Sequence, residues 1–213
     1  MKIDTEEQPD LAQQYKVMSI PNVKLFHKGK VIAEFAGALP KSQVERWLAQ
    51  HLPDPEGEEL ETLLKTIEKL PAEQAIERLR KFLSSHPGKK EAVLALAQRL
   101  VFVDPAEARQ LVSDIQAGDP HHDAANDIRT LAELMELQSE NGSQAAAHLM
   151  QAKEALSHGA FEKAIQQIIQ AVSVDKHFRD DLPRRSAIAL FHLWGEEHEL
   201  TRKYRRQFSM ALY

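Results

Sequence analysis

Residues 19–39 read SIPNVKLFHKGKVIAEFAGAL, and this stretch decides how the first part of the chain folds. Apolar residues alternate with polar ones around Val23 and Leu25, which is the pattern of a half-exposed strand. The glycine within residues 28–30 predicts a tight turn. A second alternating run follows that turn, at Val31, Ala33 and Phe35, so the stretch is predicted to form a β-hairpin.

Two helices are predicted on either side of this hairpin. A short helix should follow Pro9, where apolar residues recur at helical spacing (Leu11, Ala12 and Tyr15). A longer helix is predicted over residues 41–52, with Val44, Trp47 and Leu48 on one face. Residues 1–52 are therefore predicted to form one small α/β domain.

A linker is predicted at residues 53–57, Pro-Asp-Pro-Glu-Gly. Two prolines and a glycine so close together are typical of chain that lies outside a helix. Strand signals nearly vanish after the linker, so residues 58–213 are predicted to form an all-helical domain. Leucines and an isoleucine mark its first helix between Leu60 and Leu70, and Pro71 is predicted to start the second, since proline is tolerated in a first turn.

The helical part contains an internal repeat. An alanine, two large apolar residues and a proline occur at Ala75, Leu79, Phe82 and Pro87. The same spacing recurs one repeat later, at Ala108, Val112, Ile115 and Pro120. A partial third copy has Ala164, Ile168 and Ala171, with Lys176 where the proline would stand. This is the second-helix half of the tetratricopeptide pattern, a repeat of about 34 residues, in which the small alanine lets two helices approach closely.

The rest of the helical part is less regular. The first-helix half of the repeat lacks the consensus tryptophan and glycine–tyrosine pair. Two helices are predicted in the long gap before the third copy, at residues 124–140 and 143–157. Gly195 is predicted to separate two C-terminal helices. The first carries Ala187, Leu190, Phe191 and Trp194 inward, and the second carries the stripe Leu200, Tyr204, Phe208 and Leu212.

Composition excludes several classes of function. The chain has no cysteine, which excludes disulfides, cysteine catalysis and thiolate metal sites in this polypeptide and fits a reducing compartment. The formal net charge of −5 argues against nucleic-acid binding, because domains that neutralise phosphates are usually strongly basic. No apolar run reaches the ~20 residues of a membrane span, and the first residues lack the apolar core of a signal peptide. We therefore expect a soluble cytoplasmic protein.

The titratable clusters do not predict an enzyme. Adjacent histidines in residues 121–123 point to different faces of a helix, so this segment is interpreted as a helix start rather than a metal site. His192 and His198, on either side of Gly195, are as readily explained as solvated side chains as they are as metal ligands. Acidic pairs such as Asp180-Asp181 make no acid/base pair unless burial separates their pKa values. We therefore predict no catalytic, cofactor-binding or metal-binding residue.

The one dense basic cluster lies in the last helix, at Arg202, Lys203, Arg205 and Arg206. It is either a solvated face opposite the apolar stripe, a docking surface for an acidic partner, or a phosphate or RNA site that lacks the aromatic residues needed for stacking. Apolar residues that fall off the stripe lie close to this cluster. The docking hypothesis therefore names Arg202, Arg205, Arg206, Met210 and Tyr213.

Ser19-Ile20-Pro21, followed by a strand, a glycine turn, a second strand, Gly37-Ala38 and a closing helix, resembles the C-terminal half of a thioredoxin fold. Lys2-Ile3-Asp4 resembles the end of that fold's preceding central strand. The resemblance implies a cis peptide bond before Pro21, a position that faces the redox cysteines in that family. The family's earlier elements and Cys-x-x-Cys turn would lie before Met1.

We therefore expect either a fragment of a longer protein or a chain that starts at an internal methionine. In both cases the thiolate needed for redox chemistry is missing. The strand at residues 23–27 would also lack a neighbour, and an open strand edge recruits other chains. We therefore expect either self-association through residues 1–40 or local mobility there.

Together the two parts resemble the YbbN-type co-chaperones, or chaperedoxins, from Lys2 to Tyr213. The strongest matches are SIPNVKLFHKGK, GAFEKAIQQ and the terminal FRDD, ALFHLWG and YRRQF segments. The resemblance implies a mainly α fold: a partial thioredoxin-like α/β segment (hairpin plus helices) followed by an α-α superhelical tetratricopeptide-like domain. It also implies a bacterial cytoplasmic protein that holds unfolded clients and passes them to large ATP-driven chaperones of the chaperonin or DnaK type.

Two other functions remain open from the residues alone. The repeat groove could serve as an adaptor for one specific protein partner. The chain could also be a non-catalytic fragment of a thioredoxin-type oxidoreductase. Fold class does not separate these hypotheses.

Overall fold

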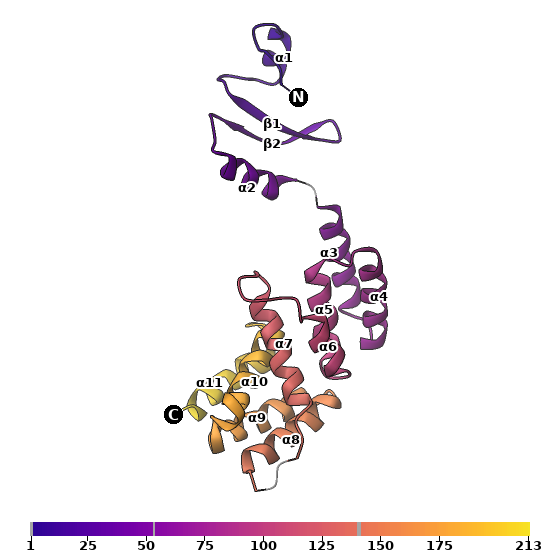
Figure 1. The fold of residues 1–213 in the computed structure, drawn as a ribbon, viewed down its shortest axis with the longest axis vertical. Helices are drawn as coiled ribbons and strands as arrows, with labels where there is room; N and C mark the ends of the chain where they lie inside the picture. The colour runs from indigo at the N-terminus through magenta and orange to yellow at the C-terminus, as the bar shows by residue number, and fades with distance from the viewer. Residues whose placement is uncertain (1, 53, 140–141) are drawn as a thin grey trace. The chain divides into compact units, whose positions relative to one another are not determined.

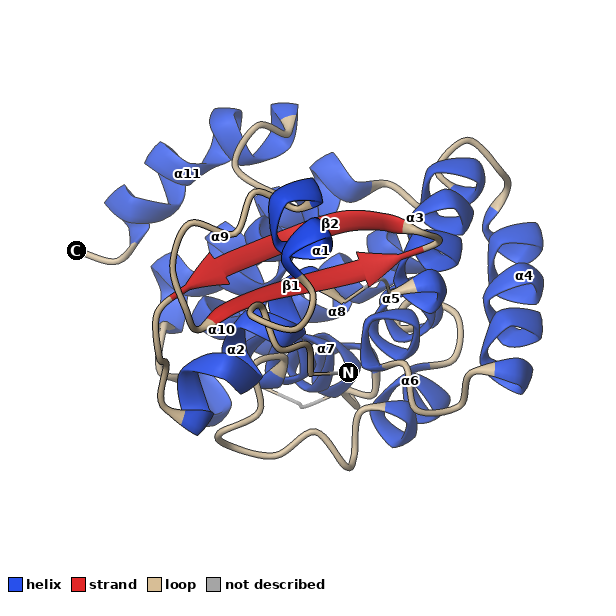
Figure 2. Ribbon diagram, turned by 90° about the horizontal axis from the view of Figure 1, so that it is seen from above, coloured by secondary structure: helices blue, strands red, loops and turns tan. Residues whose placement is uncertain are grey.

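The computed structural model describes residues 2–52, 54–139 and 142–213 (Figure 1). Its internal contacts divide the chain into two compact units, residues 1–58 (the N-terminal unit) and residues 59–213 (the helical unit). Helices dominate, and the described strands form one antiparallel pair (Figure 2). The predicted mainly α fold with a short α/β segment at its start is confirmed.

The N-terminal unit contains the predicted hairpin and both predicted helices. Its elements are α1 (Pro9–Gln14), β1 (Asn22–His27), β2 (Lys30–Ala36) and α2 (Lys41–His51). Both residues of the hairpin turn have positive φ, 49° at Lys28 and 77° at Gly29. A turn of this hand matches the twist of the two strands, and glycine adopts it without steric cost. Residues 2–4, predicted as the end of a central strand, form no strand, because no described neighbour pairs with them.

The two helices of this unit pack on opposite faces of the hairpin. Phe35 pairs with Val23 and shares its face, whereas Phe26 alternates to the other face. The ring of Tyr15, at the end of α1, lies 5.3 Å from Phe26, and that of Trp47, on α2, lies 4.8 Å from Phe35. Figure 1 shows α1 and α2 on either side of the strands. An aromatic pair therefore links each helix to the hairpin.

Nine helices follow among the described residues of the chain. They are α3 (Pro55–Ile67), α4 (Ala72–Ser85), α5 (Lys90–Leu100), α6 (Pro105–Leu111), α7 (His122–Met135), α8 (Gln144–Ser157), α9 (Phe161–Asp175), α10 (Phe178–Trp194) and α11 (Glu199–Ala211). Helices α4 to α7 pack in chain order, and α8 packs on α9. Helix α10 packs against both α7 and α9, so it joins the two halves of the helical unit. No helix within the described ranges is long and apolar enough to cross a membrane.

The predicted linker was wrong in its second half, because α3 already begins at Pro55. Asp54 caps this helix: its Oδ1 accepts a hydrogen bond from the backbone N–H of Gly57 at 2.9 Å. Proline at the first helical position lacks only an N–H that has no partner there anyway. A Cβ at Gly57 would lie 2.3 Å from the Asp54 carboxylate, so glycine makes room for the cap. Pro53 lies outside the described residues.

The second copy of the repeat was only partly correct. Ala108 is buried in α6, but that helix ends at Leu111, so Val112 and Ile115 lie in the following loop instead of the helix. Both side chains remain buried. The Arg129 guanidinium on α7 donates hydrogen bonds to the backbone carbonyls of both residues, which holds this loop in place. The repeat pattern therefore predicted correctly that these residues are buried, but it predicted a longer helix than α6.

The core of the helical unit is built on small residues where α8 meets α9. Buried alanines on both helices allow close approach; they are Ala145, Ala146, Ala152, Ala155, Ala164 and Ala171. Leu149 and Ile168 fill the seam and are fully buried. The tetratricopeptide logic of small residues at the crossing and large residues beside it thus applies most clearly here.

Candidate protein-binding surfaces

The C-terminal helix α11 docks through the predicted apolar stripe. Tyr204 and Phe208 are buried, and the Phe208 ring lies 5.7 Å from that of Phe191 on α10. The Tyr204 hydroxyl accepts a hydrogen bond from the Gln166 side chain at 2.6 Å and donates to Glu162 at 2.8 Å. Helix α11 therefore packs on α9 as well as on α10.

The basic cluster on α11 is exposed, as predicted, but most of its side chains form ion pairs with acidic residues. Each pairing uses a separate acid: Arg202 with Glu197 at 3.5 Å, Lys203 with Glu162 at 2.6 Å, and Arg205 with Glu196. Hydrogen bonds from Lys203 and Tyr204 lower the pKa of Glu162, and the Glu162 carboxylate raises the pKa of Lys203. Solvent screens such pairs, so each contributes little to stability.

The proposed docking residues lie along one face of α11. An open depression there is lined by Glu196, Glu197, Thr201, Arg202, Arg205, Arg206 and Ser209. Beyond it, the side chain of Met210 is 69% exposed and Tyr213 is fully exposed. The structure thus places all five candidates on or near one accessible end of the chain, with apolar groups beside mixed charges.

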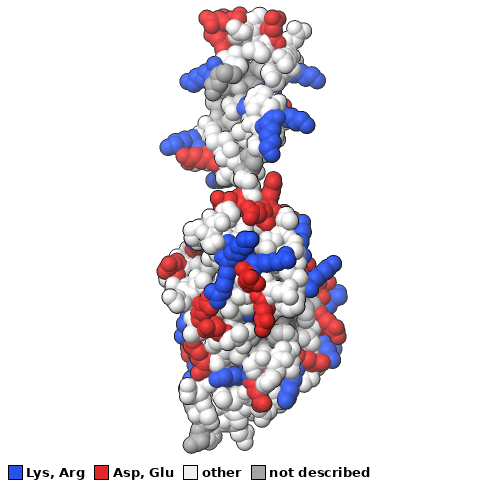
Figure 3. All heavy atoms as spheres, turned by 90° about the vertical axis from the view of Figure 1, so that its right-hand side faces the viewer, with Lys and Arg blue, Asp and Glu red and all other residues white. Residues whose placement is uncertain are grey.

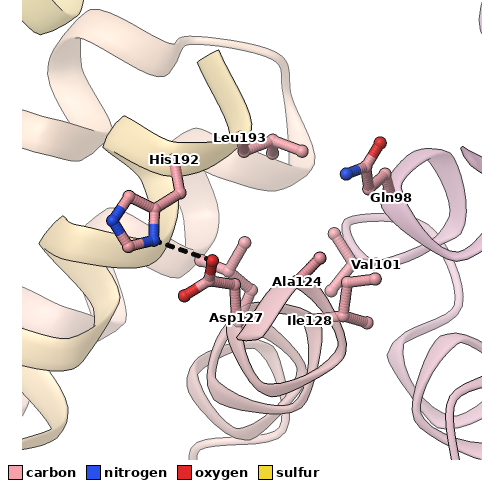
Figure 4. Close-up of a pocket in the computed structure, with 8 residues that line it drawn as sticks. Gln98, Val101, Ala124, Asp127, Ile128, His192 and Leu193 are labelled. Atoms are coloured by element: carbon pink, nitrogen blue, oxygen red, sulfur yellow. Dashed lines mark hydrogen bonds and ion pairs between the residues drawn. The ribbon is translucent and has the colours of Figure 1, made fainter. Parts of the chain in front are cut away.

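A second surface feature was not predicted from the sequence. A small pocket of about 70 Å³ lies between α5, α7 and α10 (Figure 4). Its apolar lining comes from Val101, Ala124, Ile128, Leu131 and Leu193, and its polar lining from Gln98, Asp127 and His192. The His192 Nδ1 lies 2.9 Å from the Asp127 Oδ2. The sequence held no signal for this pair, because 65 positions separate the two residues.

Burial shapes the electrostatics of this pocket. Asp127 is partly buried, and desolvation raises the pKa of its carboxyl although the hydrogen bond from His192 opposes the shift. Asp123, one turn earlier on α7, raises the pKa of Asp127 further by repulsion. Partial burial therefore disfavours the charged form of the Asp127 carboxyl, and an additional cation beside it would stabilise that charged form.

The other histidines singled out in the sequence lie at helix starts. His121 and His122 stand at the start of α7, with Asp123 in its first turn, as the sequence indicated. His198 caps α11 by accepting a hydrogen bond from the Leu200 N–H, and its ring stacks on Trp194 at 5.5 Å. In the part of the chain that the structure describes, no three His, Cys, Asp or Glu residues gather as a metal site would require.

Most of the large apolar side chains that are exposed among the described residues lie in the N-terminal unit. None of its described residues is buried. Large apolar side chains exposed there are Ile3, Met18, Ile20, Val23, Phe26, Val31, Ile32, Leu39 and Leu52. Met18 and Ile20 are 93% and 74% exposed, and they lead into the Ile20–Pro21 peptide bond, which is cis.

The charged side chains of the helical unit are intermingled rather than segregated by sign on the face that Figure 3 shows. Ion pairs connect neighbouring helices: Arg80 with Glu107 at 2.6 Å and Arg109 with Glu136 at 2.6 Å. Arg185 joins α10 to α7 through Glu133 at 3.1 Å. Each of these partly exposed pairs contributes at most modestly to stability.

Two family models match the chain. The thioredoxin model matches residues 1–50, and a tetratricopeptide repeat model matches residues 122–213. The fold and these matches define a protein with a thioredoxin-like segment and a helical tetratricopeptide-like region. A tetratricopeptide region implies interaction with other proteins.

Several thioredoxins match the N-terminal part of the chain. The chain is 35% identical over 51 residues to a thioredoxin of Chlorobaculum thiosulfatiphilum, covering 24% of this chain and 47% of that protein. It is 37% identical over 51 residues to thioredoxin 2 of Chlorobaculum tepidum, with the same coverage. With the chloroplastic thioredoxin Y2 of Arabidopsis thaliana it shares 49% identity over 47 residues, covering 22% of this chain and 28% of that protein. The chain thus spans about half the length, or less, of these relatives.

Proposed function

We propose that this protein is a cytoplasmic co-chaperone of the YbbN type, which holds unfolded client proteins and passes them to a large ATP-driven chaperone. It acts by binding and not as an enzyme, since a thioredoxin-like segment without cysteine has no thiolate nucleophile. The observation that carries the proposal is the apolar surface of the N-terminal unit. Such a surface, joined to a repeat region made for protein contacts, suits unfolded chains that expose apolar segments.

The physical basis of client holding is the hydrophobic effect. Burying one large apolar side chain contributes about 1.5–3 kcal/mol, without requiring a particular client sequence. Met18 and Ile20 are 93% and 74% exposed, so a client would gain a large part of that contribution at each. The holdase hypothesis therefore predicts broad client range, whereas an adaptor would select one partner.

The intact chain should suppress aggregation of two unrelated proteins diluted from denaturant, measured by light scattering at equimolar ratio. The double substitution Met18→Ser and Ile20→Ser should remove most of that suppression, because it deletes the two most exposed apolar groups of the N-terminal unit. The matched control replaces Val103 and Val174, two exposed residues of the helical unit, by serine. No suppression by the parent chain, or equal loss in the control, would refute client holding through the N-terminal unit.

Hand-over is proposed to use the exposed end of α11, where Arg202, Arg205 and Arg206 lie near Met210 and Tyr213. Arg205→Glu with Arg206→Glu should reduce capture of a chaperonin-type or DnaK-type chaperone by about tenfold, because charge reversal turns attraction into repulsion. Capture by the parent chain should also weaken as salt rises to physiological strength. Surface plasmon resonance at two salt concentrations measures both effects.

The control for this variant is Arg78→Glu with Lys81→Glu, which reverses the same charge on exposed positions of α4. Helix content and melting temperature should stay nearly unchanged in both variants, since exposed charges contribute little to stability. If the α11 variant unfolds, its arginines are structural. If it captures the chaperone as well as the parent does, docking uses another surface.

A second candidate function is an adaptor that binds one specific protein partner. The pocket between α5, α7 and α10 favours it, because a defined apolar cavity beside a carboxylate selects among ligands. Selective recovery of one partner, with no suppression of aggregation, would replace the holdase by the adaptor.

A further inference from the structure

The pocket between α5, α7 and α10 has a size that restricts its occupant. At about 70 Å³ it is far below the roughly 300–1,000 Å³ of small-molecule and cofactor sites. It is also about half of an engineered cavity of about 150 Å³ that holds benzene. A single aliphatic side chain is the group that matches this volume.

The lining of the pocket indicates the chemistry of that group. Its floor is apolar and fixed, since Val101, Ile128 and Leu131 are almost completely buried in the core. Figure 4 shows Leu193 on one side and Ala124 on the other, with no charged group among the residues of the floor. An aliphatic side chain is accepted there, and a charged one would lose its hydration without a partner.

The rim of the pocket is polar and carries negative charge. Gln98 and His192 lie at opposite sides of the opening, and Asp127 lies beneath His192 (Figure 4). The Gln98 amide has both donors and an acceptor, which suits a peptide backbone. The Asp127 side chain is 21% exposed and its partner His192 is 59% exposed, so a lysine or arginine can approach the carboxylate from the solvent.

We propose that this pocket is a binding site for one leucine-sized side chain of an extended polypeptide, with a lysine or arginine next to it that pairs with Asp127. The backbone beside the inserted side chain lies across Gln98. This inference rests on the proposed protein-binding function and adds a sequence preference to it. Clients or partners that bind here carry an aliphatic–basic pair.

The test measures fluorescence anisotropy of labelled eight-residue peptides with the full-length chain. Each peptide has glycine–serine flanks and differs only in its central pair. The Leu-Lys peptide should bind about ten- to fifty-fold more tightly than the Ala-Lys peptide, because leucine buries three more carbon atoms than alanine does. It should bind about three- to tenfold more tightly than Leu-Glu, and this second difference should shrink at high salt.

Two variants assign the binding to this site. Ala124→Leu places a leucine in the pocket and should abolish binding of the Leu-Lys peptide, whereas Ala147→Leu, on the exposed face of α8, should leave it unchanged. Asp127→Asn should remove the preference for lysine over glutamate. Its control is Asp123→Asn, since the Asp123 side chain is fully exposed one turn away and carries the same charge. Ala124→Leu and Ala147→Leu each replace one good helix former by another. Melting curves verify that all four variants keep the fold.

Several outcomes overturn the proposal. The Leu-Lys peptide fails to bind the parent chain, binds no better than Ala-Lys, or binds Ala124→Leu as well as the parent. Equal affinity for Leu-Lys and Leu-Glu overturns the role of Asp127. Failure of the aggregation assay with these peptide results intact would leave the pocket in place and refute only the holdase function.

Discussion

Backbone amides of β1 and β2 should exchange with solvent at least about a thousandfold faster than those of α8 and α9. The helical unit has a contiguous core, so its most protected amides open only with global unfolding, at about 5–15 kcal/mol. The hairpin has two strands and no buried residue among those described, and such hairpins are marginally stable in water. Each tenfold difference in exchange corresponds to about 1.4 kcal/mol of opening free energy.

The concentration dependence of this exchange tests the open strand edge. Within the described residues β1 pairs only with β2, so its outer edge carries unpaired backbone groups. If chains associate through residues 1–40, protection of β1 should rise with protein concentration, and sedimentation should show dimers. Strong protection of residues 23–27 in a chain that stays monomeric on dilution would contradict both self-association through residues 1–40 and local mobility there.

Replacing Ile168 by alanine should destabilise the helical unit by about 2–5 kcal/mol, because the side chain is fully buried where α8 meets α9. For a domain of this size each kcal/mol lowers the melting temperature by about 2–4 °C. The removed atoms leave a cavity that the surrounding alanines are too small to fill. Denaturant unfolding followed by circular dichroism measures the change.

The matched control is Val174→Ala on the same helix, where the side chain is 45% exposed. It should cost under about 1 kcal/mol, since most of the deleted surface is already in water. A similar loss in both variants would mean that the seam between α8 and α9 does not carry the stability. Equal stability of Ile168→Ala and the parent would mean the same.

Prediction from sequence succeeded where the pattern was strong and local. The hairpin at residues 22–36 has alternating apolar residues and a glycine turn, and both signals act within a few residues. The stripe of Tyr204 and Phe208 likewise follows from helical spacing, and both residues are buried as predicted.

Prediction failed where a local cap outweighed the pattern and where most of a helix is buried. Pro55 was assigned to a linker, yet the Asp54 cap makes proline a suitable first residue of α3. Helix α5 was not predicted, because Ala92 and residues 94–97 are all buried and its polar residues are confined to the two ends of the helix. A continuous apolar run of this kind gives a weak amphipathic period.

The amino-acid sequence was enough to predict the division into an α/β part and a helical part, the lack of thiol chemistry, and the residues that α11 turns inward. These depend on residue types and on spacings shorter than a few helical turns. The packing of the helices was needed to show that Asp127 lies beside His192, that Arg129 holds the loop after α6, and that α10 joins α7 to α9. Such contacts join residues that are distant along the chain, and only the packing of whole helices sets which of them become neighbours.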